Sequence, residues 1–127
     1  MKKILIAEDE VTLRGVLAHV INQDGFSTIE AGDGEEGLRK ALSEHPDLIL
    51  LDIIIPKMDG LAMLKKLRED AWGNNVPVII LTNVDPDNKA LEEIVKYKAS
   101  YYLIKTIVSI ENIVAKIKEL LEAKPVS

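Results

Sequence analysis

The chain has 127 residues, 47% of them hydrophobic, with 16 basic and 21 acidic side chains and a formal net charge of −5. This length fits one domain that buries about two-thirds of its unfolded surface, and the absence of cysteine excludes disulfides, thiolate metal sites and thiol nucleophiles. The acidic balance argues against a nucleic-acid or anionic-membrane surface, and no apolar run is long enough for a signal peptide or a membrane span. We therefore expect a cytoplasmic protein without membrane insertion.

Short apolar runs alternate with amphipathic segments along the whole chain. In order, the predicted strands cover residues 4–7, 26–31, 48–51, 78–81 and 101–104. The first, third and fourth runs are almost entirely Ile, Leu and Val, a composition typical of parallel strands covered on both faces. After each strand, apolar residues recur at helical spacing, over residues 13–21, 38–42, 64–71, 91–95 and 110–121. These stripes predict five helices.

Turn-forming residues agree with this division. Asp24-Gly25 ends the first predicted helix and Gly73-Asn74-Asn75 ends the third. Asp85-Pro86-Asp87 precedes the fourth helix, and Ser109 is placed to cap the fifth. Four of the five predicted helices therefore have a start or stop signal in the sequence.

The strict alternation of strand and helix predicts an α/β fold of the (βα)5 type. Short connections favour right-handed crossovers, which produce a doubly wound five-stranded parallel sheet. We expect one domain over residues 1–123 and a short polar tail over residues 124–127.

Polar residues follow four of the five predicted strands. The first strand is followed by Glu8 and Asp9, the third by Asp52, the fourth by Thr82 and the fifth by Lys105. Ligands of open α/β sheets bind beyond the carboxyl ends of the strands, so these side chains should meet in one crevice if their strands are neighbours. Clustered carboxylates repel one another unless a cation binds between them, and oxygen-only ligands favour Mg²⁺. The pattern indicates a carboxylate that accepts a phosphoryl group as an acyl phosphate.

The same positions resemble those of a known family. Residues 3–10 (KILIAEDE) resemble the first strand and acidic pair of response-regulator receiver domains, the CheY-like phosphoacceptor modules of two-component signalling. Residues 51–60 (LDIIIPKMDG) resemble the family's most specific motif, a phosphoacceptor Asp followed by a proline and a Met-Asp-Gly turn. Leu81-Thr82 and residues 102–105 (YLIK) match the switch hydroxyl, the aromatic switch residue and the lysine. The resemblance covers essentially the whole chain and implies the flavodoxin-like strand order 2-1-3-4-5.

The resemblance implies a phosphorylation site combined with a metal site. Asp52 would be phosphorylated, and Asp9 and Asp52 would bind Mg²⁺ directly. The backbone carbonyl of Ile54 would be a third ligand, and Glu8 would act through a water molecule.

The resemblance also implies a switch and a set of partners. Lys105 and Thr82 would hold phosphoryl oxygens, and Tyr102 would turn inward on activation, changing the surface of the fourth helix, fifth strand and fifth helix. A sensor histidine kinase or a histidine phosphotransfer protein would supply the phosphoryl group, and a downstream protein would read the changed surface. We expect no direct nucleic-acid binding and no enzyme activity beyond self-phosphotransfer and self-dephosphorylation.

Three positions depart from the family pattern. Thr106 follows Lys105 where the family usually has a proline in a cis peptide bond, and a non-proline cis bond costs about 2.5–4 kcal/mol. Lys98-Ala99 stands in place of Gly-Ala, and Asn83 replaces a small residue after Thr82. We expect differences in the loop after the fifth strand, in the turn before it and at the entrance to the site.

Two other functions would use some of the same residues. An aspartyl-phosphate hydrolase commonly has a second Asp two residues after the nucleophile as its general acid, and here that position is Ile54. A receiver that binds partners without phosphorylation would not need the acidic, hydroxyl and lysine residues that this sequence carries together. The phosphorylated switch is therefore the leading hypothesis.

Other noticeable features have simpler explanations. Residues 32–37 (GDGEEG) fit the dinucleotide pattern G-x-G-x-x-G, but three carboxylates there would repel a pyrophosphate and are better suited to cap a helix. His19 and His45 lie off the apolar stripes, which indicates solvated surface residues without partners. Trp72 is expected to pack at the end of the third helix.

Overall fold

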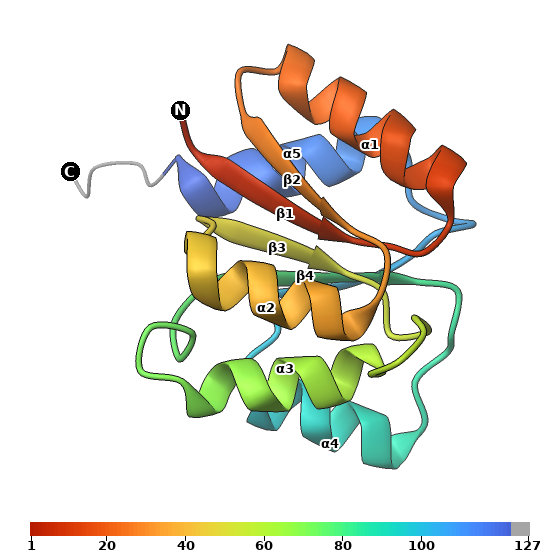
Figure 1. Ribbon diagram of the computed structural model, residues 1–127. Helices are drawn as coiled ribbons and strands as arrows, with labels where there is room; N and C mark the ends of the chain where they lie inside the picture. Colours follow the sequence, from red (N-terminus) through yellow and green to blue (C-terminus); the bar gives the residue numbers. More distant parts are fainter. Residues whose placement is uncertain (123–127) are drawn as a thin grey trace, which may run out of the picture.

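A computed structural model describes residues 1–122, so the tail expected at 124–127 lies outside the described residues. Five strands alternate with five helices along the described chain (Figure 1). The elements are β1 (Lys3–Ala7), α1 (Val11–Gln23), β2 (Ser27–Ala31), α2 (Gly34–Glu44), β3 (Leu48–Leu51), α3 (Gly60–Glu69), β4 (Val78–Thr82), α4 (Asn88–Lys96), β5 (Tyr101–Ile104) and α5 (Ile110–Leu121). Each strand end lies within one residue of its predicted position. None of these helices is long and apolar enough to cross a membrane.

The five strands form one parallel sheet in the order β2-β1-β3-β4-β5, which confirms the flavodoxin-like topology. In this register Ala7 lies opposite Leu51, and Thr82 lies opposite Ile104. The chain winds outward in one direction from β1 to β2 and in the other from β3 to β5. The strand order therefore reverses between β1 and β3, where the diverging connections leave a crevice beyond the carboxyl ends of these strands.

Helices cover both faces of the sheet, and each face has its own apolar core (Figure 1). In β1, Ile4 and Ile6 pack with α1 and α5, whereas Leu5 and Ala7 pack with α2 and α3. Because successive residues of a strand point to opposite faces, a strand covered on both sides must be apolar throughout. This explains the unbroken Ile, Leu and Val runs, since β3 and β4 are wholly buried while the edge strand β5 is only partly buried.

Side-chain caps begin four of the five helices in the described chain. In each case the cap accepts a hydrogen bond from the backbone N–H three residues later, at 2.7 to 3.1 Å. The capping residues are Asp33, Asp59, Asp87 and Ser109. The Glu36 carboxylate also accepts the N–H of Gly32, the residue before the cap, at 2.8 Å. The acidic residues of the segment 32–37 therefore cap a helix, as predicted.

The third helix is shorter than its apolar stripe predicted. It ends at Glu69, and Ala71 is exposed in the turn that follows. The Asp70 carboxylate accepts the backbone N–H groups of Trp72 and Gly73 at 2.9 and 3.1 Å. Such local side-chain bonds compete with helical hydrogen bonds, which explains the early end of α3.

One histidine differs from its expected surroundings. His19 is exposed on α1, as predicted, and His45 is exposed at the end of α2. However, the His45 ring stacks on Trp72, with ring centroids 4.4 Å apart and an interplanar angle of 10°. The prediction that His45 has no partner is wrong, because the turn after α3 places Trp72 against the end of α2.

The fourth helix contributes less to the core than predicted. Among its nine residues only Ile94 is buried, whereas Leu91 and Val95 are 44% and 77% exposed. The helical spacing of Leu91, Ile94 and Val95 is typical of core residues, and this expectation is wrong for Val95, which is mostly exposed. Because α4 packs beside α3 near the edge of the sheet, only a narrow stripe of the helix faces the core (Figure 1).

Candidate functional site

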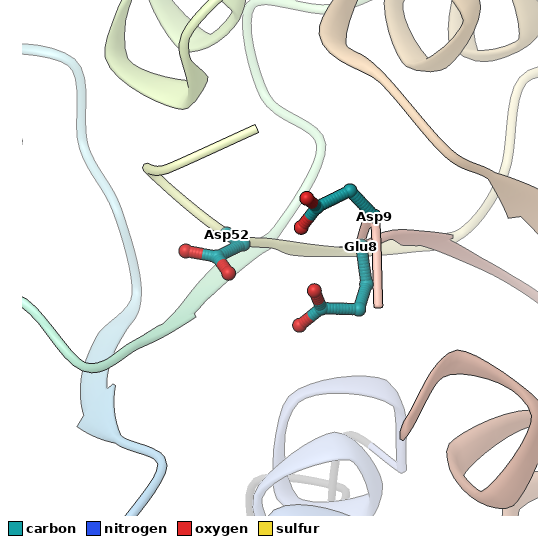
Figure 2. Close-up of side chains that lie close together, drawn as sticks. All are labelled: Glu8, Asp9 and Asp52. Carbon is teal, nitrogen blue, oxygen red and sulfur yellow. The ribbon is translucent and has the colours of Figure 1, made fainter. Parts of the chain in front are cut away.

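Three carboxylates lie together at the carboxyl ends of β1 and β3 (Figure 2). Glu8 and Asp9 follow β1, Asp52 follows β3, and one carboxylate oxygen from each lies within 4.8 Å of the others. Glu8 and Asp52 are 3% and 5% exposed, whereas Asp9 is exposed to solvent. The structure thus combines two buried acids and one accessible acid in a single cluster.

Lys105 joins the two buried acids. Its Nζ contacts Oε1 of Glu8 and lies 2.6 Å from Oδ2 of Asp52. The other oxygens of these acids accept backbone N–H groups, with Asp52 Oδ1 3.0 Å from the nitrogen of Ile54 and Glu8 Oε2 3.0 Å from that of Glu10. Both oxygens of Asp52 therefore have a fixed donor, and the two buried carboxylates share one ammonium group.

Burial and charge shift the pKa values of two groups in this cluster. Burial raises the pKa of Glu8, although the Lys105 ammonium and the Glu10 N–H partly oppose the shift. Burial disfavours the charged form of Lys105, but the carboxylates of Asp52 and Glu8 outweigh it and raise the pKa of the ammonium. Lys105 therefore stays positively charged beside Asp52.

A buried hydroxyl without a hydrogen-bond partner lies next to the acids. It belongs to Thr82, the last residue of β4, which is 1% exposed and is unpaired within residues 1–122. Buried hydroxyls normally have partners, so this one offers a donor to a group bound nearby. Thr82 lines a pocket of about 340 Å³, whose other lining residues are Glu8, Asp9, Glu10, Asp52, Ile54, Asn83, Val84 and Lys105.

Tyr102 connects β5 to the loop after β4. Its ring is partly buried against the core, and its hydroxyl donates a hydrogen bond to the carbonyl of Val84. Burial and the negative charges of Asp85 and Asp52 raise the pKa of the tyrosine hydroxyl, which therefore stays protonated as a donor. The loop that follows Thr82 is thus tied to the edge strand.

Two glycines allow the loop after β3 to lie close to its neighbours. A Cβ atom on Gly60 would lie 2.3 Å from the carbonyl oxygen of Asp52, and one on Gly34 would lie 1.9 Å from that of Met58. No side chain fits at either position, so glycine is required where α2 and α3 begin. The sequence interpretation treated Gly34 only as part of a false dinucleotide motif and missed this packing role.

Sequence reasoning also missed Arg14. Its Nη1 donates to the carbonyl oxygen of Glu8 at 2.8 Å, and its Nε lies 3.2 Å from Oε1 of Glu30 on β2. The guanidinium therefore holds the turn that carries Glu8 and Asp9. The available signal was a basic residue in the first turn of the helix that follows the acidic pair.

The loop after β5 contains no proline and follows a trans path. No peptide bond is cis in the described part of the chain, so the bond from Lys105 to Thr106 is trans. The N–H groups of Ile107 and Val108 both donate to the carbonyl of Ile104 at 3.0 Å. With Thr106 after it, the Lys105 side chain reaches the acidic cluster.

Comparison with known protein families supports the resemblance. The family model described as the response regulator receiver domain matches residues 4–118. The chain belongs to the response regulator receiver domain family. Receiver domains are the phosphoacceptor signalling switches of two-component systems, and a hydrolase function is not favoured for this receiver domain.

Curated relatives are longer than this receiver domain. The alkaline phosphatase synthesis transcriptional regulatory protein PhoP of Bacillus subtilis is 41% identical over 86 residues, which cover 68% of this chain and 35% of PhoP. The response regulator ArlR of Staphylococcus aureus is 34% identical over 126 residues, which cover 98% of this chain and 55% of ArlR. The receiver domain thus spans about a third to about half of the length of these relatives.

Solved receiver domains have the same fold. A Francisella response regulator receiver domain superposes with a TM-score of 0.85 at 30% identity, covering 96% of this chain and 98% of its own. A CheY-like receiver domain protein from Methanospirillum hungatei superposes with a TM-score of 0.88 at 26% identity, covering 96% of this chain and 94% of its own.

Proposed function

We propose that Asp52 accepts the phosphoryl group in this receiver domain. The observation that carries the proposal is a buried carboxylate held by Lys105 Nζ at 2.6 Å, with two further acids and the unpaired hydroxyl of Thr82 beside it. Glu8 shares this environment, and Asp52 is chosen because it occupies the phosphoacceptor position of the motif at residues 51–60.

The transfer uses Asp52 as a nucleophile. A carboxylate oxygen attacks the phosphorus of a phosphohistidine on the partner, and the new O–P bond forms as the N–P bond breaks. The imidazole leaves with the electron pair, and Asp52 becomes an acyl phosphate. Self-dephosphorylation is the attack of water on the same phosphorus, which releases phosphate and restores the carboxylate.

The three carboxylates fit a bound Mg²⁺ ion, which prefers oxygen ligands. Asp9 and Asp52 would bind it directly, the backbone carbonyl of Ile54 would be a third ligand, and Glu8 would act through water. Bound there, Mg²⁺ offsets the negative charge that the acids present to an incoming phosphoryl group.

Phosphorylation gives Thr82 and Lys105 new acceptors. The Thr82 hydroxyl can then form the hydrogen bond that it lacks, and the Lys105 ammonium gains a charge-assisted bond. Movement of Thr82 changes the space beside the ring of Tyr102 and the loop to which that ring is tied. The surface formed by α4, β5 and α5 changes as a result, which biases a two-state equilibrium.

The partners of this receiver domain follow from this chemistry. A sensor histidine kinase or a histidine phosphotransfer protein donates the phosphoryl group, and a downstream protein target reads the changed surface. The relative PhoP is a transcriptional regulatory protein, but the acidic charge of this chain argues against direct nucleic-acid binding by the receiver domain itself. We place this activity in the cytoplasm.

The test is the mass of the protein after incubation with acetyl phosphate and Mg²⁺. Wild type should gain the mass of one phosphoryl group, and Asp52→Asn should gain none. Asp85→Asn is the matched control, since it removes a nearby exposed carboxylate, and it should be modified like wild type. An adduct that persists in Asp52→Asn would contradict the assignment, and multiple-turnover release of phosphate without an adduct would favour a hydrolase.

A further inference from the structure

A buried arginine lies far from the acidic cluster. Arg68, near the end of α3, is 8% exposed, and its guanidinium donates to four backbone carbonyls. Nε bonds Tyr97 at 2.8 Å, Nη1 bonds Gly73 at 2.8 Å and Val76 at 2.7 Å, and Nη2 bonds Lys98 at 3.1 Å. Within residues 1–122 no carboxylate forms an ion pair with it, so carbonyl dipoles alone stabilise its charge.

The four carbonyls belong to two separate segments. Gly73 and Val76 lie in the loop before β4, and Tyr97 and Lys98 lie at the end of α4 before β5. The last carbonyls of a helix have no partners within the helix, and a cation is favourable there. Arg68 therefore joins the end of α4 to the α3–β4 loop, on the edge of the sheet opposite the acidic cluster (Figure 1).

The turn after α4 needs this support. Lys98 stands where the family commonly has glycine, and its φ of 56° lies in the left-handed region that disfavours most side chains. Besides the Arg68 bond to its carbonyl, its Nζ lies 3.2 Å from Oδ1 of Asn74. The Asn74 amide in turn donates to the carbonyl of Arg68 at 3.1 Å. These bonds hold the left-handed residue in place.

The two ends of α4 are anchored differently. Its middle contributes only Ile94 to the core, so the helix depends on contacts at its ends. The loop before its first turn is tied to β5 by the bond from Tyr102 to Val84, two residues from Thr82. Only this end adjoins groups that phosphorylation alters.

We propose that Arg68 is a positioning residue that makes the C-terminal end of α4 a fixed pivot. Phosphorylation of Asp52 then displaces the first turns of α4, with the exposed Leu91, while the turn at Tyr97–Ala99 stays in place. The direction of this movement rests on the proposed function, whereas the anchoring by Arg68 does not.

The test is amide hydrogen exchange, read residue by residue by NMR in the full chain. The N–H of Ala99 donates to Ile94 at 3.1 Å, so its exchange reports on the turn. In unmodified Arg68→Met, this exchange should be at least about tenfold faster than in wild type. Lys66→Met, which removes an exposed cation from the same helix, should match wild type within about twofold.

The second measurement compares wild type before and after modification with acetyl phosphate and Mg²⁺. Amides of residues 88–91 should change exchange by about fivefold or more, while Lys98 and Ala99 should stay within about twofold. In Arg68→Met, or in Arg68→Lys if the first variant does not fold, the change should extend to Ala99.

Two results would overturn the pivot. One is equal exchange at Ala99 in wild type and in the Arg68 variant that folds. The other is a change at Ala99 in modified wild type as large as that at residues 88–91. If wild type takes no adduct at Asp52, the proposed function fails, while the unmodified proteins still test the anchoring by Arg68.

Discussion

Polar side chains differ in their hydrogen bonding between the two ends of the parallel strands, which we call the carboxyl edge and the amino edge of the sheet. At the carboxyl edge, Glu8 and Asp52 share the ammonium of Lys105, Asp9 lies beside them, and the buried hydroxyl of Thr82 has no described partner. At the amino edge, four of the five N–H groups of the Arg68 guanidinium donate to backbone carbonyls. An unpaired buried donor leaves capacity to bind a new group, whereas a side chain held by four hydrogen bonds contributes mainly to stability. The fold thus separates the reactive edge from the structural edge.

Removal of the metal should give the largest effect on phosphotransfer, because the ion binds at the reactive edge itself. Excess chelator should abolish phosphotransfer from acetyl phosphate, since the acids then repel the incoming phosphoryl group. Asp9→Asn should need at least about tenfold more Mg²⁺ for half-maximal modification, equivalent to about 1.4 kcal/mol. The measurement is the rate of adduct formation by mass across a Mg²⁺ titration, and an unchanged rate in chelator would contradict the metal site.

Loss of the arginine should give the largest effect on stability. Arg68→Met leaves four carbonyls without their donor, so the free energy of unfolding should fall by about 3 kcal/mol. Urea denaturation of the unmodified protein measures this change, with Lys66→Met as the control near zero. If the free energy of unfolding falls by less than about 0.5 kcal/mol, Arg68 does not stabilise the amino edge as proposed.

The lifetime of the phosphorylated state should respond to Ile54. Ile54 and Val84 line the pocket that contains Asp52, and neither side chain can hydrogen-bond a water molecule. Self-dephosphorylation should therefore be slow, even though Ile54 is 63% exposed and shields the site only in part. Ile54→Asn should accelerate loss of phosphate about tenfold, or about 1.4 kcal/mol of barrier. If wild type decays fast and Asn83→Ala slows it, Asn83 rather than Ile54 controls access.

Thr82→Val should leave stability almost intact while removing the switch. A buried hydroxyl without a partner costs free energy, so its replacement by a methyl group should leave the free energy of unfolding unchanged or raise it by up to about 1 kcal/mol. Urea denaturation gives this value, and partner affinity with and without phosphorylation gives the loss of response. A clear destabilisation would mean that the hydroxyl already has a partner.

Substitution of Asp33, the capping residue of α2, should give the smallest effect on stability. Its bond from the Glu36 N–H, and then the charge of Lys57, lower its pKa below the ordinary 3.8. A lowered pKa in the folded state adds stability above pH 3.8. This stability is lost as the pH falls through the pKa of Asp33 in the folded protein. Wild type should therefore exceed Asp33→Asn in unfolding free energy at neutral pH, and the difference should vanish in acid. A difference in unfolding free energy that stays constant with pH would contradict a stabilising role of the Asp33 charge.

The sequence predicted what depends on local pattern and chain order. The apolar runs of β1, β3 and β4 predicted a doubly covered sheet, and the strand-end rule pointed to the residues that the structure brings around Asp52. The role of Arg68 could not be predicted, because two of its partners lie 29 and 30 residues away. Likewise, the exposure of Val95 follows from how α4 packs, since its helical spacing alone is typical of a core residue.

The stacking of His45 on Trp72 has a practical consequence for spectroscopy. Trp72 is the only tryptophan in the sequence, and it lies in the turn between α3 and β4, beyond the ends of the strands that face away from Asp52. Its fluorescence therefore reports the integrity of the structural edge, where the histidine ring covers one face of the indole. The emission should change on unfolding and in Arg68→Met, and stay nearly constant when Mg²⁺ or phosphate binds at the other edge. An optical signal for the switch has to be introduced in the loop after β4.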